Sequence, residues 1–217
     1  MCRGPIPAGF HIRHDPAGEE LISVLDEVLA AFRKTLGPLS ESPPAWYALG
    51  VLCAVCGLRE DARAYYEMAI RAKPDYPEAQ FSLGIVLAEL ERYGEAAIAL
   101  ERAKEGLGDS FRLRSELGRV YFNGNKLDEA VHEFEAVLER NPDSLFILRN
   151  LGTCLLRMNR IDEAVRVLER VIALDPGHAD THRRLALAYH RKGMDERAEY
   201  HLQRASEIDS HEPGGED

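Results

Sequence analysis

Residues 111–144 read FRLRSELGRVYFNGNKLDEAVHEFEAVLERNPDS, and the pattern of this 34-residue stretch recurs five times along the chain. When the units are counted from residues 43, 77, 111, 145 and 179, position 7 is leucine and position 20 is alanine in all five. Position 8 is glycine in four units and alanine in the fifth, and no insertion interrupts 43–212. A period of this length without a slip predicts a stack of similar supersecondary units.

Two apolar stripes in each unit predict two amphipathic helices. Positions 4, 7, 8 and 11 share one helical face, and positions 20, 24 and 27 share a face of a second helix. The small residues at positions 8 and 20 let the two helices approach closely in an antiparallel hairpin. Residues that accept turn geometry separate the two helices: Gly57, Asn123–Asn125, Asn159 and Gly193. Proline ends the second helix in three units, at Pro74, Pro142 and Pro176.

This pattern resembles that of the tetratricopeptide repeat (TPR) family, W-x2-L-G-x2-Y…A-x3-F…A…P. The first unit carries it as Trp46-x2-Leu49-Gly50, and the third carries Leu117-Gly118-x2-Tyr121…Ala130-x3-Phe134…Pro142. The resemblance implies an all-α fold: a TPR solenoid of five antiparallel helix hairpins in a right-handed superhelix, with an N-terminal capping helix.

The predicted organisation follows from the repeat and from a partial copy upstream of it. Residues 25–32 align with 127–134, three periods later, whereas Pro16 and Gly18 interrupt the segment before them. We therefore predict an irregular N-terminal arm (1–18), a capping helix and linker (19–42), TPR 1 (43–76), TPR 2 (77–110), TPR 3 (111–144), TPR 4 (145–178), TPR 5 (179–212) and an acidic tail (213–217).

Composition excludes several classes of function. The 37 acidic and 27 basic residues among 217 leave a formal net charge of −10, which disfavours nucleic acid as a partner. No apolar run approaches the roughly 18 residues of a membrane-spanning helix, so we expect no membrane insertion. The N-terminus lacks the apolar core of a secretory signal, and we expect a cytoplasmic location.

No motif indicates an enzyme, a cofactor or a metal site. Phosphate-binding, nucleophile-elbow and zinc-protease motifs are absent from the sequence. Cys53-x-x-Cys56 is open to two interpretations, a redox or half-zinc pair and simple packing, and its place late in a helix favours packing. His178 and His182 have a metal-capable spacing, but His182 occupies the packed position 4. We expect a non-catalytic protein with no cofactor and no metal.

The concave wall is the candidate binding site. TPR proteins bind partners on the surface formed by their first helices, and the helical face opposite the packed one carries positions 2, 5, 6, 9, 12 and 13. In units three to five this face holds seven arginines and two acidic residues, so its net charge is 7 − 2 = +5. The basic groove comprises Arg112, Arg119, Phe122, Asn123, Arg149, Asn150, Arg157, Arg183, Arg184 and Arg191.

Arginine in a concave wall suits an acidic or carboxylate-ended peptide, because its planar fork holds a carboxylate through two hydrogen bonds. The alternative is that these arginines pair with Glu116, Asp180 and other neighbours as ordinary solvated side chains. Asn150 and Arg184 match two places of the carboxylate clamp known in some TPR proteins, and Arg119 is basic at a third. Ser115 and Asp180 depart from that clamp.

Units one and two present an apolar groove instead, formed by Tyr47, Val51, Val55, Phe81 and Ile85. An exposed patch of this kind requires a cover. Three covers stay open: residues 1–18 folded back through Ile6, Phe10 and Ile12, an amphipathic helix of a partner, or a second copy of the chain.

The predicted function is a non-catalytic protein–protein interaction scaffold, an adaptor or assembly factor that binds an acidic or carboxylate-ended segment. The alternative is a structural subunit of a larger complex or homo-oligomer held through apolar end faces. Salt discriminates the two, because binding in the basic groove weakens with ionic strength and an apolar interface does not.

Overall fold

The computed structural model describes residues 27, 31 and 42–211, and ten helices with no strand lie within 42–211. They are α2 (Pro43–Val55), α3 (Arg59–Ala72), α4 (Pro77–Glu89), α5 (Tyr93–Leu107), α6 (Phe111–Asn123), α7 (Leu127–Arg140), α8 (Leu145–Arg157), α9 (Ile161–Leu174), α10 (Ala179–Arg191) and α11 (Asp195–His211). The predicted arm, acidic tail, and all of the capping helix and linker except residues 27, 31 and 42 lie outside the described residues.

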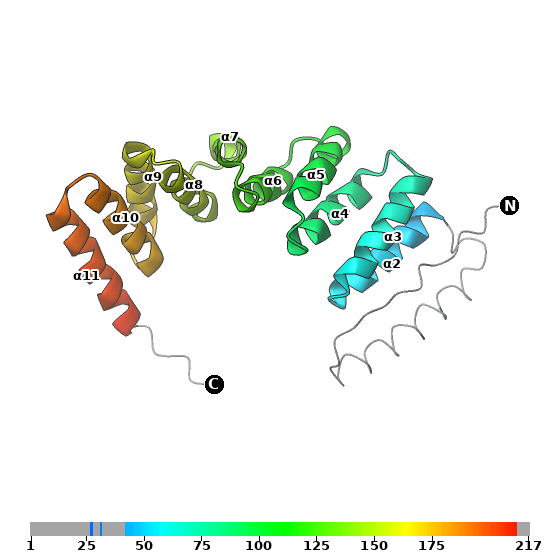
Figure 1. Ribbon diagram of the computed structural model, residues 1–217, viewed down its shortest axis with the longest axis horizontal. Helices are drawn as coiled ribbons and strands as arrows, with labels where there is room; N and C mark the ends of the chain where they lie inside the picture. The colour runs from blue at the N-terminus through cyan, green and yellow to red at the C-terminus, as the bar shows by residue number, and fades with distance from the viewer. Residues whose placement is uncertain (1–26, 28–30, 32–41, 212–217) are drawn as a thin grey trace.

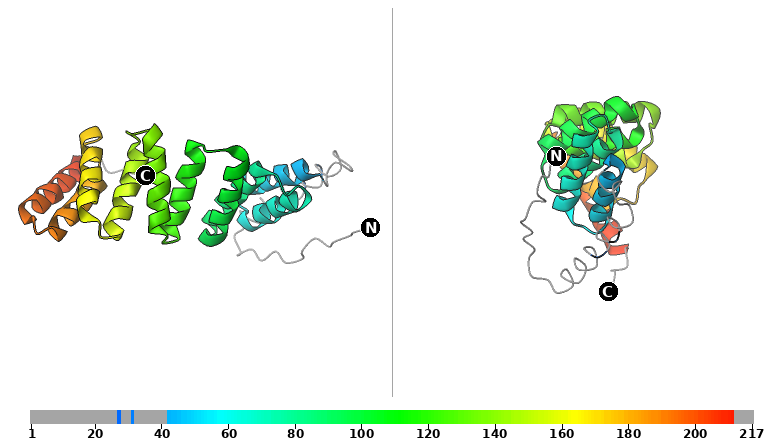
Figure 2. Two further views of the ribbon diagram at one scale, coloured as in Figure 1. Left: turned by 90° about the horizontal axis from the view of Figure 1, so that it is seen from above. Right: turned by 90° about the vertical axis from the view of Figure 1, so that its right-hand side faces the viewer.

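The helices pack as five consecutive hairpins, which confirms the predicted all-α architecture. Each first helix packs against the second helix of its own hairpin, and each second helix packs against the first helix of the next. Figure 1 shows the hairpins in an arch, with α4, α6, α8 and α10 toward the hollow and α5, α7 and α11 outside them. Seen from above, they form a single row (Figure 2). The right-handed superhelix stays a prediction.

The glycine at position 8 is required by the side chain at position 24. A Cβ atom on Gly50, Gly84, Gly118 or Gly152 would lie within 2.6 Å of the residue at position 24 of the same unit. Those four residues are at most 2% exposed: Tyr66, Leu100, Phe134 and Leu168. The fifth unit has Ala186 at position 8, and its Leu202 is 55% exposed. Close contact between the helices therefore depends on a missing methyl group.

Every turn between the two helices of a hairpin uses the same backbone conformation. Position 15 has a φ between 59° and 76° in all five units: Gly57, Glu91, Asn125, Asn159 and Gly193. Four of these residues have the glycine or asparagine that favours this region, as the sequence predicts. Glu91 adopts it without such a preference, so the packing of α4 on α5 imposes the turn there.

One contact across each hairpin changes its chemistry from unit to unit. Positions 4 and 23, which are 19 residues apart, hold a stacked aromatic pair in the first unit, where the ring centroids of Trp46 and Tyr65 lie 6.2 Å apart. The third unit has an ion pair there, and the fifth unit has two histidines. The second and fourth units carry Gln80 with Ala99 and Leu148 with Val167.

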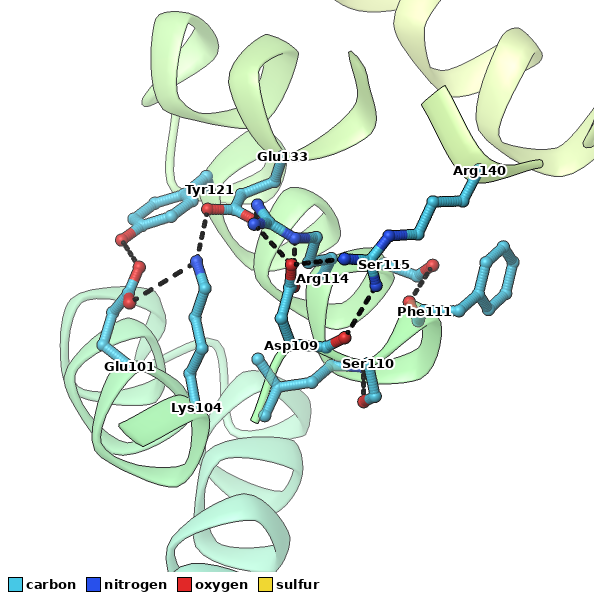
Figure 3. Close-up of polar contacts among 11 residues, drawn as sticks. Glu101, Lys104, Asp109, Ser110, Phe111, Arg114, Ser115, Tyr121, Glu133 and Arg140 are labelled. Carbon is cyan, nitrogen blue, oxygen red and sulfur yellow. Dashed lines mark hydrogen bonds and ion pairs between the residues drawn. The ribbon is translucent and has the colours of Figure 1, made fainter. Parts of the chain in front are cut away.

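An ionic network lies where the apolar core divides. Buried apolar side chains form one cluster over α2–α6 and a second over α7–α11. Glu133, only 3% exposed, lies between Lys104 and Arg114, with N–O distances of 2.9 and 2.8 Å (Figure 3). The Asp109 side chain also accepts from Arg114 Nη2 at 2.9 Å, and this contact lowers the pKa of its carboxyl. Charged contacts thus join the second and third units.

Candidate functional site

The ten residues of the predicted basic groove lie on the first helices α6, α8 and α10. All ten are exposed or half-buried, as a binding surface requires. Position 12 belongs to the binding surface in one unit but not in the next, because Phe122 is half-buried whereas Leu156 is only 5% exposed and lies in the core. Exposed apolar side chains also lie on this wall, with Phe146 51% and Leu187 44% exposed. The basic half is therefore a mixed surface rather than a purely charged one.

Four of the seven groove arginines form ion pairs within the chain. Arg119 pairs with Glu116 at 2.7 Å and Arg184 with Asp180 at 2.6 Å, the two acids that the alternative interpretation named. The other two pair with acids on or just after the second helix of the same unit: Arg149 with Asp175 at 3.8 Å, and Arg183 with Asp209. When these four acids are counted with the seven arginines, the net charge of the basic groove is 7 − 4 = +3 instead of +5.

The sequence analysis missed Asp175 and Asp209 because they lie outside the groove positions. Each is 26 residues after its arginine, which places a position 5 arginine against position 31 of the same unit. A repeated pair of opposite charges at that spacing is the signal that would have found them. The same two positions hold Tyr47 with Lys73 in the first unit and Phe81 with Leu107 in the second.

Three groove arginines have no carboxylate partner among the described residues, and all three are exposed. The guanidinium group of Arg112 lies over the ring of Phe81, with its carbon 5.0 Å from the ring centroid. This cation–π contact joins position 2 of the third unit to position 5 of the second and leaves the positive charge without a counter-ion.

Arg157 and Arg191 occupy the same position, 13, in successive units. Arg157 donates to the carbonyl oxygen of Phe122 at 3.2 Å and to Asn125 Oδ1 at 2.7 Å. Arg191 donates to the carbonyl oxygen of Leu156 at 2.9 Å. Each arginine therefore binds the end of the first helix in the preceding unit, which holds its guanidinium group in place while the charge stays exposed.

The predicted apolar groove is only partly exposed. Val55 is 82% and Val51 38% exposed, whereas Tyr47, Phe81 and Ile85 are half-buried. The Tyr47 ring packs against Tyr66 and Tyr76, with centroids 5.7 and 5.4 Å apart. Because Arg112 covers Phe81, the open part of the predicted apolar groove is centred on the two valines.

The cysteines and histidines of interest lie in packed positions. Cys53 is buried, and this burial raises the pKa of its thiol to about 12; Cys56 is half-buried at the end of α2. His178 accepts from the backbone N–H of Thr181 at the start of α10. Within the described part of the chain, no three histidine, cysteine or acidic side chains gather at a metal-binding distance. No helix of that part has the length and apolar character needed to cross a membrane.

A row of helical hairpins whose first helices form one continuous inner wall defines a helical-repeat protein. The chain belongs to the tetratricopeptide repeat family, because the model of the family described as "Tetratricopeptide repeat" matches residues 22–77, 57–110, 115–157 and 149–213. This fold suggests a protein–protein interaction scaffold, and proteins of this family are generally non-catalytic.

Solved structures of TPR proteins share the fold. YrrB, described as a TPR protein with an unusual peptide-binding site, is 25% identical with a TM-score of 0.73; the match covers 84% of this chain and 94% of YrrB. A MamA structure designated AMB-1 is 26% identical with a TM-score of 0.70, covering 79% of this chain and 94% of MamA. MamA from Desulfovibrio magneticus RS-1, at 21% identity and a TM-score of 0.73, covers 79% and 97% and shares the fold. No curated protein sequence matched this chain.

Proposed function

We propose that this protein is a non-catalytic, cytoplasmic adaptor or assembly factor that binds an acidic segment of a partner along α6, α8 and α10. The observation that carries the proposal is the set of three exposed arginines without carboxylate partners in the described part of the chain, Arg112, Arg157 and Arg191. They come from three successive units, so an extended segment lying across the wall would meet one after another.

The geometry of these arginines supports binding of carboxylates in particular. Arg157 and Arg191 are each held by backbone carbonyl groups, which lowers the entropy lost when a ligand binds. A carboxylate that reaches a fixed guanidinium group can accept two parallel hydrogen bonds from it. An extended peptide that crosses α6, α8 and α10 in turn would present its carboxylates to arginines of successive units.

The four paired arginines have a secondary role in this proposal. A ligand carboxylate at Arg119 or Arg184 would have to displace Glu116 or Asp180, and the exchange of one exposed ion pair for another yields little free energy. Arg149 is the most open to exchange, because its distance to Asp175 is 3.8 Å. Exposed Phe146 and Leu187 would add apolar contacts beside the acidic ones.

The apolar groove extends the proposed surface at its N-terminal end. Val51 and Val55 are exposed on the first helix of the first unit, where an apolar side chain of the same partner could bind. The three covers named from the sequence stay open, because residues 1–18 lie outside the described part of the chain. The structural neighbour YrrB, with its peptide-binding site, is a precedent for peptide binding by this architecture.

One observation favours the alternative function, a structural subunit joined through its end faces. Leu202 and Tyr200 on the last helix are 55% and 57% exposed, although position 24 is buried in the other units. Association through this end would persist at high salt and at the same strength after reversal of the groove arginines. Sedimentation of the chain alone at 0.1 and 1 M salt separates the two functions.

Selection from a random peptide library tests the proposed function directly. We expect peptides enriched on the immobilised protein to contain two or more acidic residues and to be released by high salt. Enrichment of apolar or basic peptides, or no enrichment over a control protein of equal charge, would contradict acidic specificity.

A further inference from the structure

The last helix, α11, is held to the stack by few large apolar side chains. Its buried apolar residues are two alanines, Ala198 and Ala205, at 7% and 2% exposure. Leu202 at position 24 is 55% exposed, and its unit has Ala186 at position 8 where the other four units have glycine. The contacts of His201 with α10 therefore stand beside polar ones, such as the ion pair of Arg183 with Asp209, in attaching α11.

His201 forms a hydrogen-bonded pair with His182 across the hairpin. The two Nδ1 atoms are 2.9 Å apart, and His182 is only 3% exposed. His182 Nε2 lies 3.2 Å from the carbonyl oxygen of Pro176, which can only accept, so Nε2 carries a proton. In neutral His182 the Nδ1 atom is then an acceptor, and His201 donates from Nδ1.

The groups around the pair come from three elements. On α10, Tyr189 stacks on His201 with an interplanar angle of 8°, and on α11 Tyr200 meets His201 edge-on. Arg197 of α11 and His182 both disfavour a positive charge on His201, while Glu169 of α9 favours it. Burial is the largest influence, and the net effect lowers the pKa of His201 below its ordinary value of 6.5.

We propose that the fifth unit is an acid-sensitive latch, in which protonation of the His182–His201 pair releases α11 from α10 while the first four units stay folded. When both rings are protonated, each Nδ1 atom carries an N–H and the two donors face each other at 2.9 Å, so the hydrogen bond is lost; with one added proton, one ring can still accept. A proton on His201 Nε2 would place a charge on a half-buried ring packed between Tyr189 and Tyr200, where burial disfavours it. Repeat proteins can open at their ends, because each unit contacts only its neighbours.

The lowered pKa of His201 determines in which direction the attachment of α11 changes with pH. A histidine whose pKa is lower in the folded than in the unfolded state binds a proton more readily after opening. The attachment of α11 is therefore complete above about pH 6.5 and weakens as the pH falls below it. If the proposed function holds, the same opening would also alter the groove, because it breaks the ion pair between Arg183 of α10 and Asp209 of α11.

Amide hydrogen exchange of the full chain tests the latch without any partner. Protection factors, corrected for the intrinsic pH dependence of exchange, are compared at pH 7.0 and 5.5 for α10–α11 and, within the same molecule, for α8–α9. One histidine with a lowered pKa can reduce the protection of α11 by at most about eightfold over this range, so we expect a fall within that limit and protection of α8–α9 to stay within twofold. Equal changes in both hairpins, or no change in α11, would overturn the proposal.

Two variants distinguish an effect of protonating the His182–His201 pair from a general effect of low pH on the fold. His182→Leu with His201→Val installs the residues that the fourth unit has at the same positions, Leu148 and Val167, and should abolish the pH dependence of α11. His132→Gln removes an exposed histidine on α7, away from α11, and should leave it unchanged. A double variant that keeps the pH dependence would overturn the proposal. Should that variant misfold, proton NMR titration of the unmodified chain decides: His201 titrating at or above pH 6.5 contradicts the latch.

Discussion

Arg114 on α6 donates from Nη1 to Oε2 of Glu133 on α7 at 2.8 Å, and this ion pair occupies the place that two aromatic rings occupy in the first unit. Lys104 of the preceding unit donates to the other carboxylate oxygen at 2.9 Å. Glu133 therefore links the halves of its own hairpin and links that hairpin to its neighbour. It does so beside Gly108, where the second unit lacks the proline that closes three others.

Replacing Glu133 with glutamine should destabilise the protein by about 2–4 kcal/mol, because two partly buried cations lose the carboxylate between them. The free energy of unfolding from urea denaturation measures the effect. Glu135→Gln, an exposed residue on the same helix, is the control and should change the free energy by less than about 0.5 kcal/mol. Equal effects of the two variants would mean that the network contributes no more than a surface charge.

Gly152→Ala should be strongly destabilising, by about 2 kcal/mol or more, because the new methyl group would lie 2.6 Å from a side-chain carbon of fully buried Leu168. Gly94→Ala is the matched control. It lies in helix α5, nothing lies within 4 Å of its Cβ position, and the change should stabilise by about 0.5–1 kcal/mol. Thermal melting of both variants checks the opposite signs.

Ala186→Gly recreates at the fifth unit the space that the other four have. Glycine costs about 1 kcal/mol in a helix, but Leu202 can then pack against α10 and recover a similar amount. We expect a net change within about 0.5 kcal/mol, together with slower amide exchange in α11. Ala188→Gly, a buried alanine on the same helix with no such compensation, should cost more than about 1 kcal/mol. If Ala186→Gly is as damaging as Ala188→Gly, Leu202 is exposed for another reason.

The hairpin architecture could be predicted from the sequence because it depends on local rules that repeat. Leucine at position 7, alanine at position 20 and glycine at position 8 each respond to the same close helix contact in successive units, so the signal adds up. The turn at Glu91 escaped prediction because its conformation follows from packing rather than from the residue. The exposure of Leu202 escaped it because the repeat pattern predicts a buried residue at position 24 in every unit.

The inner wall was predictable as a surface but not as a charge distribution. Helical periodicity places Arg149 and Arg183 on it, yet their partners Asp175 and Asp209 lie 26 residues later on the following helix or just after it. A long arginine side chain can reach carboxylates or carbonyl groups on several elements, and position along one helix does not determine which it meets. The charge available to a ligand is thus concentrated on Arg112, Arg157 and Arg191.

Titration calorimetry of an acidic peptide from the library tests the central claim most directly. The groove variant carries Arg112→Glu, Arg157→Glu and Arg191→Glu; the control carries Arg71→Glu, Arg102→Glu and Arg166→Glu, three exposed arginines on second helices. Melting curves establish that both variants are folded. At 0.15 M salt, where charges more than about 8 Å apart are largely screened, we predict at least a tenfold loss of affinity for the groove variant and less than threefold for the control. Equal losses, or full binding by the groove variant, would contradict the claim that acidic partners bind along the first helices.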